Sequence, residues 1–286
     1  MTANQFSTHG LGGVAVAILI IFLAVSFFYT PYDPNEMNIS QRLQPPSAQH
    51  WFGSDEFGRD LFSRIMAGAR VSLLVGFLSA SIAALFGTLI GALSGYFGGW
   101  LDNLLMRFTE AVLIIPQIFL LLVMAKFFAG DIPDVSLFGR QFSGSVVVII
   151  VIIGITSWPY LARIVRAEFL SIKENEFVLA ARATGTSTGE IIFLHILPNC
   201  VAPIVVSATL GVANAITLEA YISFLGLGVR PPTATWGNML EGAYNYIETA
   251  YWLWLFPGLL ILLIVLGINF VGDGLRDALD PRSRTV

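Results

Sequence analysis

The composition indicates a membrane protein. The 286 residues are 56% hydrophobic and 12% charged, with a mean hydropathy of +0.76, whereas about one quarter of a typical soluble domain is charged. A net charge of −4 does not provide the basic patch that nucleic-acid binding requires, so we expect no nucleic-acid partner. The sequence therefore predicts a chain that crosses the membrane several times.

The sequence contains no pattern for a metal site or for ATP hydrolysis. Cys200 is the sole cysteine, so neither an intrachain disulfide nor a cysteine cluster can form. His9, His50 and His195 lack a metal-binding spacing. No GxxxxGK[ST] sequence occurs, and the polar segments are too short for a nucleotide-binding domain. We expect no metal and no cofactor on this chain, and no enzymatic activity by the chain alone.

The first apolar run predicts a membrane span followed by an extended passage. Leu11 to Tyr29 contains no charged residue and would be about 28 Å long as a helix, close to the hydrocarbon thickness. A cleaved signal peptide is the alternative for this run. The prolines between Thr30 and Gln49 then predict a non-helical passage.

The next segment, His50 to Arg64, is rich in charges of both signs. Its acidic and basic residues are spaced so that they can pair across helical turns, which predicts a solvated or interfacial segment ahead of the second span. The segment also resembles the one found there in the dipeptide/oligopeptide branch of ABC importer permeases, a branch that includes nickel permeases. The matching residues are His50, Gly53, Asp55, Gly58, Arg59 and Asp60.

The second span, Val71 to Gly99, carries a strip of glycines. Gly87, Gly91 and Gly95 are four residues apart, so they lie on one helix face. Small residues in this register let two helices approach closely in lipid, where packing replaces the hydrophobic effect. We expect a tightly packed partner helix along this strip.

Two further spans lead to the polar part of the chain. Leu104 to Phe128 predicts a third span that is kinked at Pro116. A short polar loop, Asp131 to Gly144, comes next. Gln141 to Ala162 predicts the fourth span.

The polar stretch Phe177 to Asn199 predicts two short helices joined by a turn. Gly185 is placed to end the first helix in the left-handed conformation. Ser187 and Glu190 fit a capping box that starts a second helix near Thr188. This helix is expected to stop at Pro198, which has no backbone N–H. Such an elbow suits docking of a soluble partner, and an ordinary cytoplasmic loop is the alternative.

The elbow resembles the "EAA" loop of ABC importer permeases, which couples ATPase subunits to the membrane channel. Ala180, Ala181, Gly185, Leu197 and Pro198 carry the resemblance, whereas Leu179 occupies the position of the family's glutamate. The resemblance implies an ATPase-coupling role for Phe177, Ala180, Ala181, Arg182, Gly185, Thr186, Ser187, Leu197 and Pro198.

The fifth span, Val201 to Leu227, contains an acidic residue, Glu219. An acid in lipid is costly, so its side chain should face protein or a water-filled cavity. The sequence leaves two roles open: contact with the substrate, or bracing of the helix bundle. The loop Gly226 to Asn238 is expected to be rigid, and Glu219 to Leu240 again resembles the same permease branch.

The sixth span ends the predicted membrane domain. Tyr251, Trp252 and Trp254 form an aromatic girdle at its start, and the span should end near Val271. The tail from Gly272 resembles the family's short cytoplasmic terminal helix. In it, Asp273 is the expected N-cap and Pro281 the stop.

Together, these patterns and resemblances predict an all-α membrane protein with six transmembrane helices, the transmembrane domain of a type I ABC importer. Residues 1–70 would form the first helix and an extracytoplasmic segment. Residues 71–286 would form a five-helix permease core whose coupling loop covers about 168–199. The 15 lysines and arginines divide eight against seven between the two sides, so a cytoplasmic location of the elbow and both termini rests on the resemblance.

The resemblance implies a permease in a prokaryotic inner membrane that translocates short peptides by alternating access. Its expected partners are a homologous second permease, two ABC ATPase subunits that bind ATP and Mg²⁺, an extracytoplasmic substrate-binding protein and membrane lipid. Nickel or another small solute is the alternative cargo. A gated channel is another alternative, and so is an intramembrane enzyme using Glu110 or Glu219 with a histidine.

Overall fold

The computed structural model describes residues 22, 24–26, 29–128, 133–137 and 140–279. The predicted first span, Leu11 to Tyr29, lies largely outside these residues, and so does Pro281. From residue 30 to residue 49 the chain is non-helical as predicted, apart from one 3₁₀ turn, Ile39–Gln41.

Long apolar helices make up most of the described chain. Four are long and apolar enough to cross a membrane, and a bent helix pair provides a fifth candidate. The main helices are α2 (Leu61–Phe97), α3 (Gly99–Ile114), α4 (Gln117–Phe128), α5 (Gly144–Ile172), α6 (Glu176–Ala183), α7 (Thr188–Glu190), α8 (Val201–Phe224), α9 (Trp236–Ala243) and α10 (Trp252–Leu279). The predicted all-α class is confirmed, with one small hairpin as the exception.

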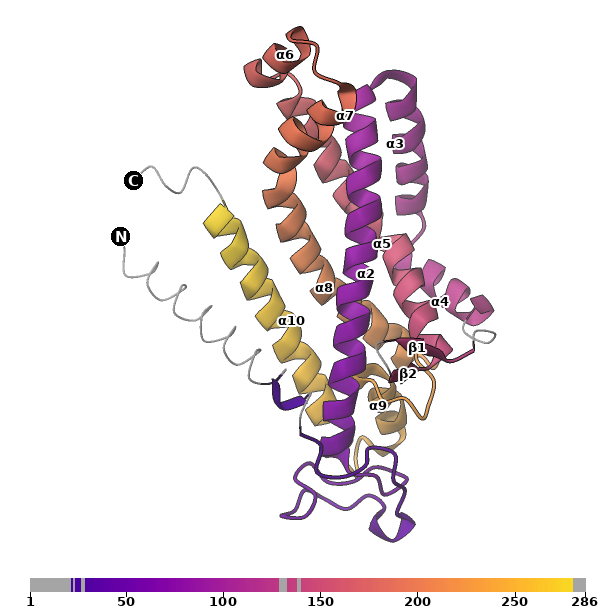
Figure 1. Ribbon diagram of the computed structural model, residues 1–286. Coiled ribbons are helices and arrows are strands. Elements are labelled where there is room, and N and C mark those ends of the chain that lie inside the picture. Colours follow the sequence, from indigo (N-terminus) through magenta and orange to yellow (C-terminus); the bar gives the residue numbers. More distant parts are fainter. Residues whose placement is uncertain (1–21, 23, 27–28, 129–132, 138–139, 280–286) are drawn as a thin grey trace.

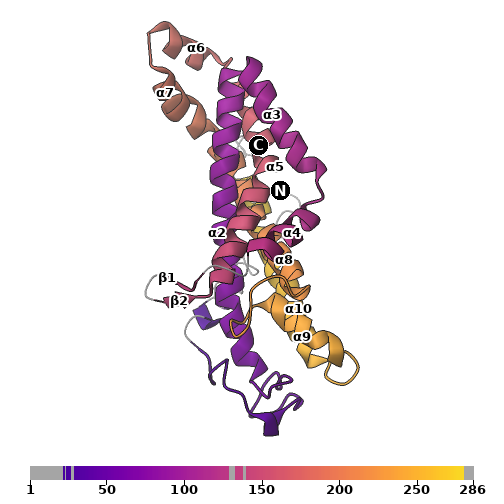
Figure 2. The same ribbon diagram turned by 90° about the vertical axis from the view of Figure 1, so that its right-hand side faces the viewer.

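The bundle is elongated, with polar segments at its two ends. Helices α2, α5, α8 and α10 run lengthwise (Figure 1). In both views α6 and α7 project at one end, and the segment that precedes α2 lies at the other (Figure 2). The largest buried cluster joins α2, α4, α5 and α8 and includes Val75, Leu121, Ile149 and Ile222.

The glycine strip of α2 packs against α5. A Cβ atom on Gly91 would lie 2.5 Å from the Ala162 carbonyl oxygen, and one on Gly95 would lie 2.6 Å from Phe169 Cβ. Neither distance leaves room for a side chain. The predicted close helix contact through this strip, which includes Gly87, is confirmed.

Helix α2 begins well before the predicted start of the second span at Val71. Asp60 is its N-cap, and the Asp60 carboxylate accepts a hydrogen bond from Ser63 N at 2.8 Å. The helix therefore includes Arg64, which the hydrophobic pattern had placed outside it. The N-cap Asp60 sets the start of the helix at Leu61. Arg64 can lie inside the helix because its side chain is paired with Asp55.

The predicted third span is a pair of helices rather than one kinked helix. Helices α3 and α4 meet at an angle of 85°, with Ile115 extended ahead of Pro116 as the residue before a proline prefers. The following loop contains an antiparallel hairpin, β1 (Val135–Leu137) with β2 (Arg140–Phe142). Helix α5 accordingly begins at Gly144 instead of Gln141.

Helix α10 continues without a break through the predicted cytoplasmic tail. It runs from Trp252 to Leu279, so Asp273 lies inside it and is not an N-cap. Gly272 lies against Leu210 of α8, and this packing favours a continuous helix. Trp252 of the predicted aromatic girdle is buried, and its indole Nε1 donates to the Ser54 carbonyl at 3.2 Å.

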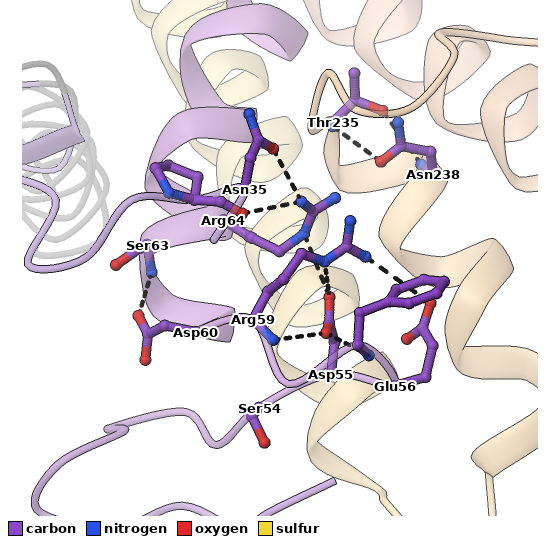
Figure 3. Close-up of polar contacts among 12 residues, drawn as sticks. Asn35, Ser54, Asp55, Glu56, Arg59, Asp60, Ser63, Arg64, Thr235 and Asn238 are labelled. Carbon is purple, nitrogen blue, oxygen red and sulfur yellow. Dashed lines mark hydrogen bonds and ion pairs between the residues drawn. The ribbon is translucent and has the colours of Figure 1, made fainter. Parts of the chain in front are cut away.

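Most charged residues of the segment ahead of α2 are buried, so the solvated alternative of the prediction is wrong. His50, Asp55, Arg59, Asp60 and Arg64 are each at most 7% exposed. Arg59 Nε donates to Asp55 Oδ2 at 2.6 Å, and Arg64 Nε lies 3.6 Å from the same oxygen (Figure 3). His50 Nδ1 lies 2.8 Å from Asp60 Oδ1. The opposite charges do pair, but between the loop residues and the first turn of α2 as well as within the loop, because buried charges require close partners.

The loop after α8 ends at Thr235 rather than at Asn238. These two residues form a capping box: Thr235 N donates to Asn238 Oδ1 at 3.0 Å, and Asn238 N donates to Thr235 Oγ1 at 3.2 Å (Figure 3). Helix α9 therefore starts at Trp236, whose indole Nε1 donates to the Ile65 carbonyl of α2 at 3.2 Å. The capping box and this hydrogen bond fix α9 against the bundle.

Candidate functional site

The first helix of the elbow ends as predicted. Helix α6 stops at Ala183, and Gly185 has a φ of +82°, a conformation that glycine adopts without strain. Gly185 N donates to Arg182 O and Thr186 N donates to Ala181 O, each at 3.1 Å. These two hydrogen bonds form a Schellman motif, which satisfies the last carbonyls of the helix.

The second elbow helix starts with the predicted capping box. Ser187 Oγ accepts from Glu190 N at 3.3 Å, and Glu190 Oε2 accepts from Ser187 N at 3.0 Å. The turn between the two helices is therefore fixed on both sides, by the Schellman motif before it and by the capping box after it.

The second elbow helix does not stop at Pro198, contrary to the prediction. A π-helical segment, Ile191–Ile196, and a 3₁₀ segment, Leu197–Cys200, lead directly into α8. Leu197 N donates to Ile192 O, five residues back. Local π and 3₁₀ turns can absorb a proline in a membrane helix, because they supply other partners for the freed backbone groups.

The predicted coupling residues differ in exposure. Leu197 packs into the core at the base of the elbow, and Ala181 and Thr186 are half-buried. The exposed ones are Phe177, Ala180, Arg182, Gly185, Ser187 and Pro198. The elbow is anchored by Val178 and Ile191, which are almost fully buried in the same cluster as Phe169 of α5.

Sequence reasoning missed an apolar surface on the elbow. Phe193 and Leu194 are 66% and 68% exposed, and Phe177 and Leu179 are 44% and 45% exposed. The signal was present as large apolar residues within a polar stretch.

The base of the elbow is tied to the bundle by charged groups that sequence spacing did not connect. Arg166 of α5 binds Asp102 of α3 with two hydrogen bonds, Nε to Oδ1 at 2.5 Å and Nη2 to Oδ2 at 2.6 Å. Ser94 of α2 also donates to Asp102. Lys173 Nζ donates to the Gly95 carbonyl at 3.0 Å. Helices α2, α3 and α5 are thereby held together where the elbow begins.

Glu219 is fully buried among α2, α8 and α9. It accepts hydrogen bonds from Ser72 Oγ at 3.1 Å and from Ser223 Oγ at 2.7 Å. Ser72 Oγ in turn accepts from Trp236 N at 3.3 Å. A buried acid with this set of partners can join three helices.

A family model covers most of the chain, including the elbow and Glu219. The model of the binding-protein-dependent transport system inner membrane component matches residues 87–285. The chain belongs to this family. As a transport permease subunit with several apolar helices, it is a multi-pass membrane protein.

The permease is similar to curated relatives along nearly its whole length. It is 42% identical to the dipeptide transport system permease protein of Alkalihalophilus pseudofirmus, over 99% of this chain and 89% of the relative. It is 43% identical to a putative peptide permease protein of Brucella ovis, over 99% and 90%. It is 37% identical to the probable D,D-dipeptide transport system permease protein of Escherichia coli, over 94% and 87%.

Solved structures confirm the fold of the permease. An inward-facing structure of the MetNI methionine ABC transporter aligns with a TM-score of 0.59 at 22% identity, over 74% of this chain and 94% of the other. A crystal structure of an amino acid ABC transporter with histidines aligns with a TM-score of 0.56 at 16% identity, over 76% and 95%. The fold is that of a type I ABC importer transmembrane domain.

Proposed function

We propose that this permease is one membrane subunit of an ATP-driven ABC importer that carries short peptides, from dipeptides to oligopeptides, by alternating access. The observation that supports this most is the similarity over 99% of the chain to relatives named for dipeptide and peptide transport. The charge-poor spans agree with a cargo of varied side chains, because they offer few groups that could select one.

The elbow is the surface on which an ATPase subunit docks. Its exposed large apolar side chains, Phe177, Leu179, Phe193 and Leu194, are of the kind that marks a protein interaction site. Leu179 occupies the position of the family's glutamate, so the contact at this position is apolar instead of charged. Closure of the ATPases on ATP moves the elbow, and the permease changes between inward-open and outward-open states.

The complete importer contains a second, homologous permease, two ATPase subunits that hold ATP and Mg²⁺, and an extracytoplasmic binding protein. The elbow and the segment that precedes α2 lie at opposite ends of the bundle (Figure 1). In this proposal the ATPases bind at the elbow end and the binding protein binds at the opposite end. This arrangement requires the elbow and both termini to be cytoplasmic in a prokaryotic inner membrane.

The test uses the complete complex in liposomes, with its own binding protein. We expect dipeptides and oligopeptides to stimulate ATP hydrolysis and to accumulate in the lumen, whereas nickel complexes should do neither. Stimulation by nickel complexes and not by peptides would show that the proposed cargo is wrong, but the assignment as an importer would stand. A permease that conducts solute without binding an ATPase would be a channel, and the proposal would be wrong altogether.

A further inference from the structure

A small pocket with aromatic walls lies in the segment that precedes α2, at the end of the bundle opposite the elbow (Figure 1). Its volume is about 210 Å³, below the range of about 300–1,000 Å³ that whole small-molecule ligands occupy. The pocket therefore has room for one chemical group rather than for a whole ligand. Its aromatic and acidic side chains are Tyr29, Tyr32, Trp51, Asp60 and Phe62.

The aromatic walls hold one another in place. The Phe62 ring packs edge-on against Trp51, with a centroid distance of 5.0 Å, and against Tyr29 at 6.4 Å. The Tyr32 hydroxyl donates to the Gln49 carbonyl at 3.0 Å. Phe62 is only 8% exposed, whereas the other three rings are between 40% and 52% exposed. The pocket is therefore anchored by a buried ring and opens on the surface of the protein.

A buried carboxylate borders the same pocket. Asp60 is 4% exposed. Its Oδ1 lies 2.8 Å from His50 Nδ1, and its Oδ2 accepts from Ser63 N at 2.8 Å. A carboxylate can accept about four hydrogen bonds, so these two contacts do not exhaust it. Aromatic rings attract cations to their faces, and a carboxylate attracts them by its charge. The pocket is therefore suited to a positively charged group.

The chain around the pocket is acidic. Residues 29–64 contain five acidic residues and three arginines, a net charge of −2 with histidine neutral. This is half of the net charge of −4, in about one eighth of the chain. Such a field attracts cations and repels anions. The ammonium group of a lipid head group brings a phosphate with it, whereas a lysine or arginine side chain brings only an apolar stem, which aromatic walls can cover.

We propose that this pocket receives a lysine or arginine side chain of the extracytoplasmic binding protein when that protein docks on the permease. The ammonium or guanidinium group would lie against the rings of Tyr29 and Trp51, with its charge toward Asp60. The inference rests on the proposed function, in which the binding protein binds at this end of the bundle, and it adds the pocket that anchors the docked protein.

The test measures the affinity of the binding protein for the complete complex in phosphatidylglycerol nanodiscs, whose lipid has no ammonium group. Trp51→Leu removes an aromatic face but keeps an apolar side chain, and it should weaken binding about fivefold to thirtyfold, as expected for a cation–π contact from which docking excludes water. Trp51→Phe keeps an aromatic face and should retain most of the affinity. Trp100→Leu is the control, because Trp100 is 76% exposed in α3; it should bind like the wild type.

A second measurement identifies the side chain that enters the pocket. Gln49→benzoylphenylalanine places a photo-crosslinker at the exposed rim. We expect it to link to a stretch of the binding protein that contains a lysine or arginine. Replacement of that basic residue by methionine should weaken binding as W51L does. The two changes together should cost little more than either alone, because they remove the same contact.

Three results would overturn the inference: W51L binding as tightly as the wild type, W51F losing as much affinity as W51L, or independent, additive losses in the combined variant. Cross-linking to lipid and not to the binding protein would assign the pocket to a lipid head group instead. If the wild-type complex does not bind the binding protein at all, the proposed function itself fails. Should W51L not assemble, Tyr32→Leu against Tyr32→Phe carries the same comparison.

Discussion

The carboxylate of Glu219 holds helices together through the serines that donate to it. Glu219→Leu would leave the hydroxyls of Ser72 and Ser223 buried without an acceptor, at about 1–3 kcal/mol for each. We expect a lower thermal denaturation midpoint for the purified complex. Glu219→Gln retains an acceptor oxygen and should lose less.

The same pair of variants separates the two roles that the sequence left open for Glu219. A lower midpoint with residual import per folded complex supports bracing of the bundle. An unchanged midpoint with loss of import would contradict it and favour contact with the substrate.

The buried Asp55 and the exposed Glu110 should respond very differently to removal. Among the described residues, Asp55→Ala leaves Arg64 without an acidic partner and Arg59 with only Glu56 at 3.9 Å. An unpaired buried charge costs about 3–5 kcal/mol. Glu110 pairs with Arg107, and their side chains are 56% and 85% exposed. Glu110→Ala should therefore cost about 0–1 kcal/mol.

The measurement for this prediction is again the denaturation midpoint of the purified complex. Equal midpoints for the Asp55→Ala and Glu110→Ala variants would show that the buried cluster does not stabilise the segment ahead of α2.

The elbow as a whole should lose its partner when its surface is altered. Ala181→Asp adds a charge beside the apolar side chains, and Gly185→Trp adds bulk where φ is +82°, at a backbone cost of about 1–2 kcal/mol. Among the described residues, a Cβ at Gly185 meets nothing within 4 Å, so the new side chain starts from an open surface and adds bulk where a protein would dock. We expect both variants to insert normally but not to retain the ATPase during purification.

The control for the elbow is Gly274→Trp in α10. A Cβ at Gly274 also meets nothing within 4 Å, and its φ is not positive. This variant should retain the ATPase. If all three variants co-purify with the ATPase and transport normally, the coupling assignment is wrong.

Features set by a few neighbouring residues could be predicted from the sequence. The capping box of Ser187 and Glu190, the left-handed Gly185 and the glycine strip of α2 all depend on spacing within one or two elements. The continuation of the helix through Pro198 could not be predicted in this way. It depends on a π turn that is held by Ile191 and Ile196, both buried in a cluster with α5.

The topology of the whole permease can be tested by labelling from outside the cell. In a Cys200→Ala background, single cysteines at positions 134 and 233 should react with an impermeant thiol reagent, and one at position 186 should not. Spans that alternate across the membrane permit no other arrangement once the elbow is cytoplasmic. Labelling at position 186 without labelling at 134 or 233 would show that the topology is inverted, with the elbow outside the cell.

Contacts between segments that are distant in the sequence could not be predicted from the sequence. Asp102 and Arg166 are 64 residues apart, and no local pattern relates them. The same is true of the bend between α3 and α4. Pro116 predicts a kink in the helix, but the bend angle of 85° depends on packing against the rest of the bundle. The charges of the segment ahead of α2 predict pairing, whereas their burial depends on how α9 and α10 cover them.

In the proposed importer, the continuous helix from Thr188 to Phe224 would act as a lever. At a rise of about 1.5 Å per residue, the arm from Thr188 to Asn214 is about 40 Å long, so a tilt of about 5° at the elbow moves the far end by about 3 Å. At the π turn Leu197 N donates to Ile192 O, so the helix is not interrupted there. A push on the elbow would then shift the part of α8 around Asn214 as well.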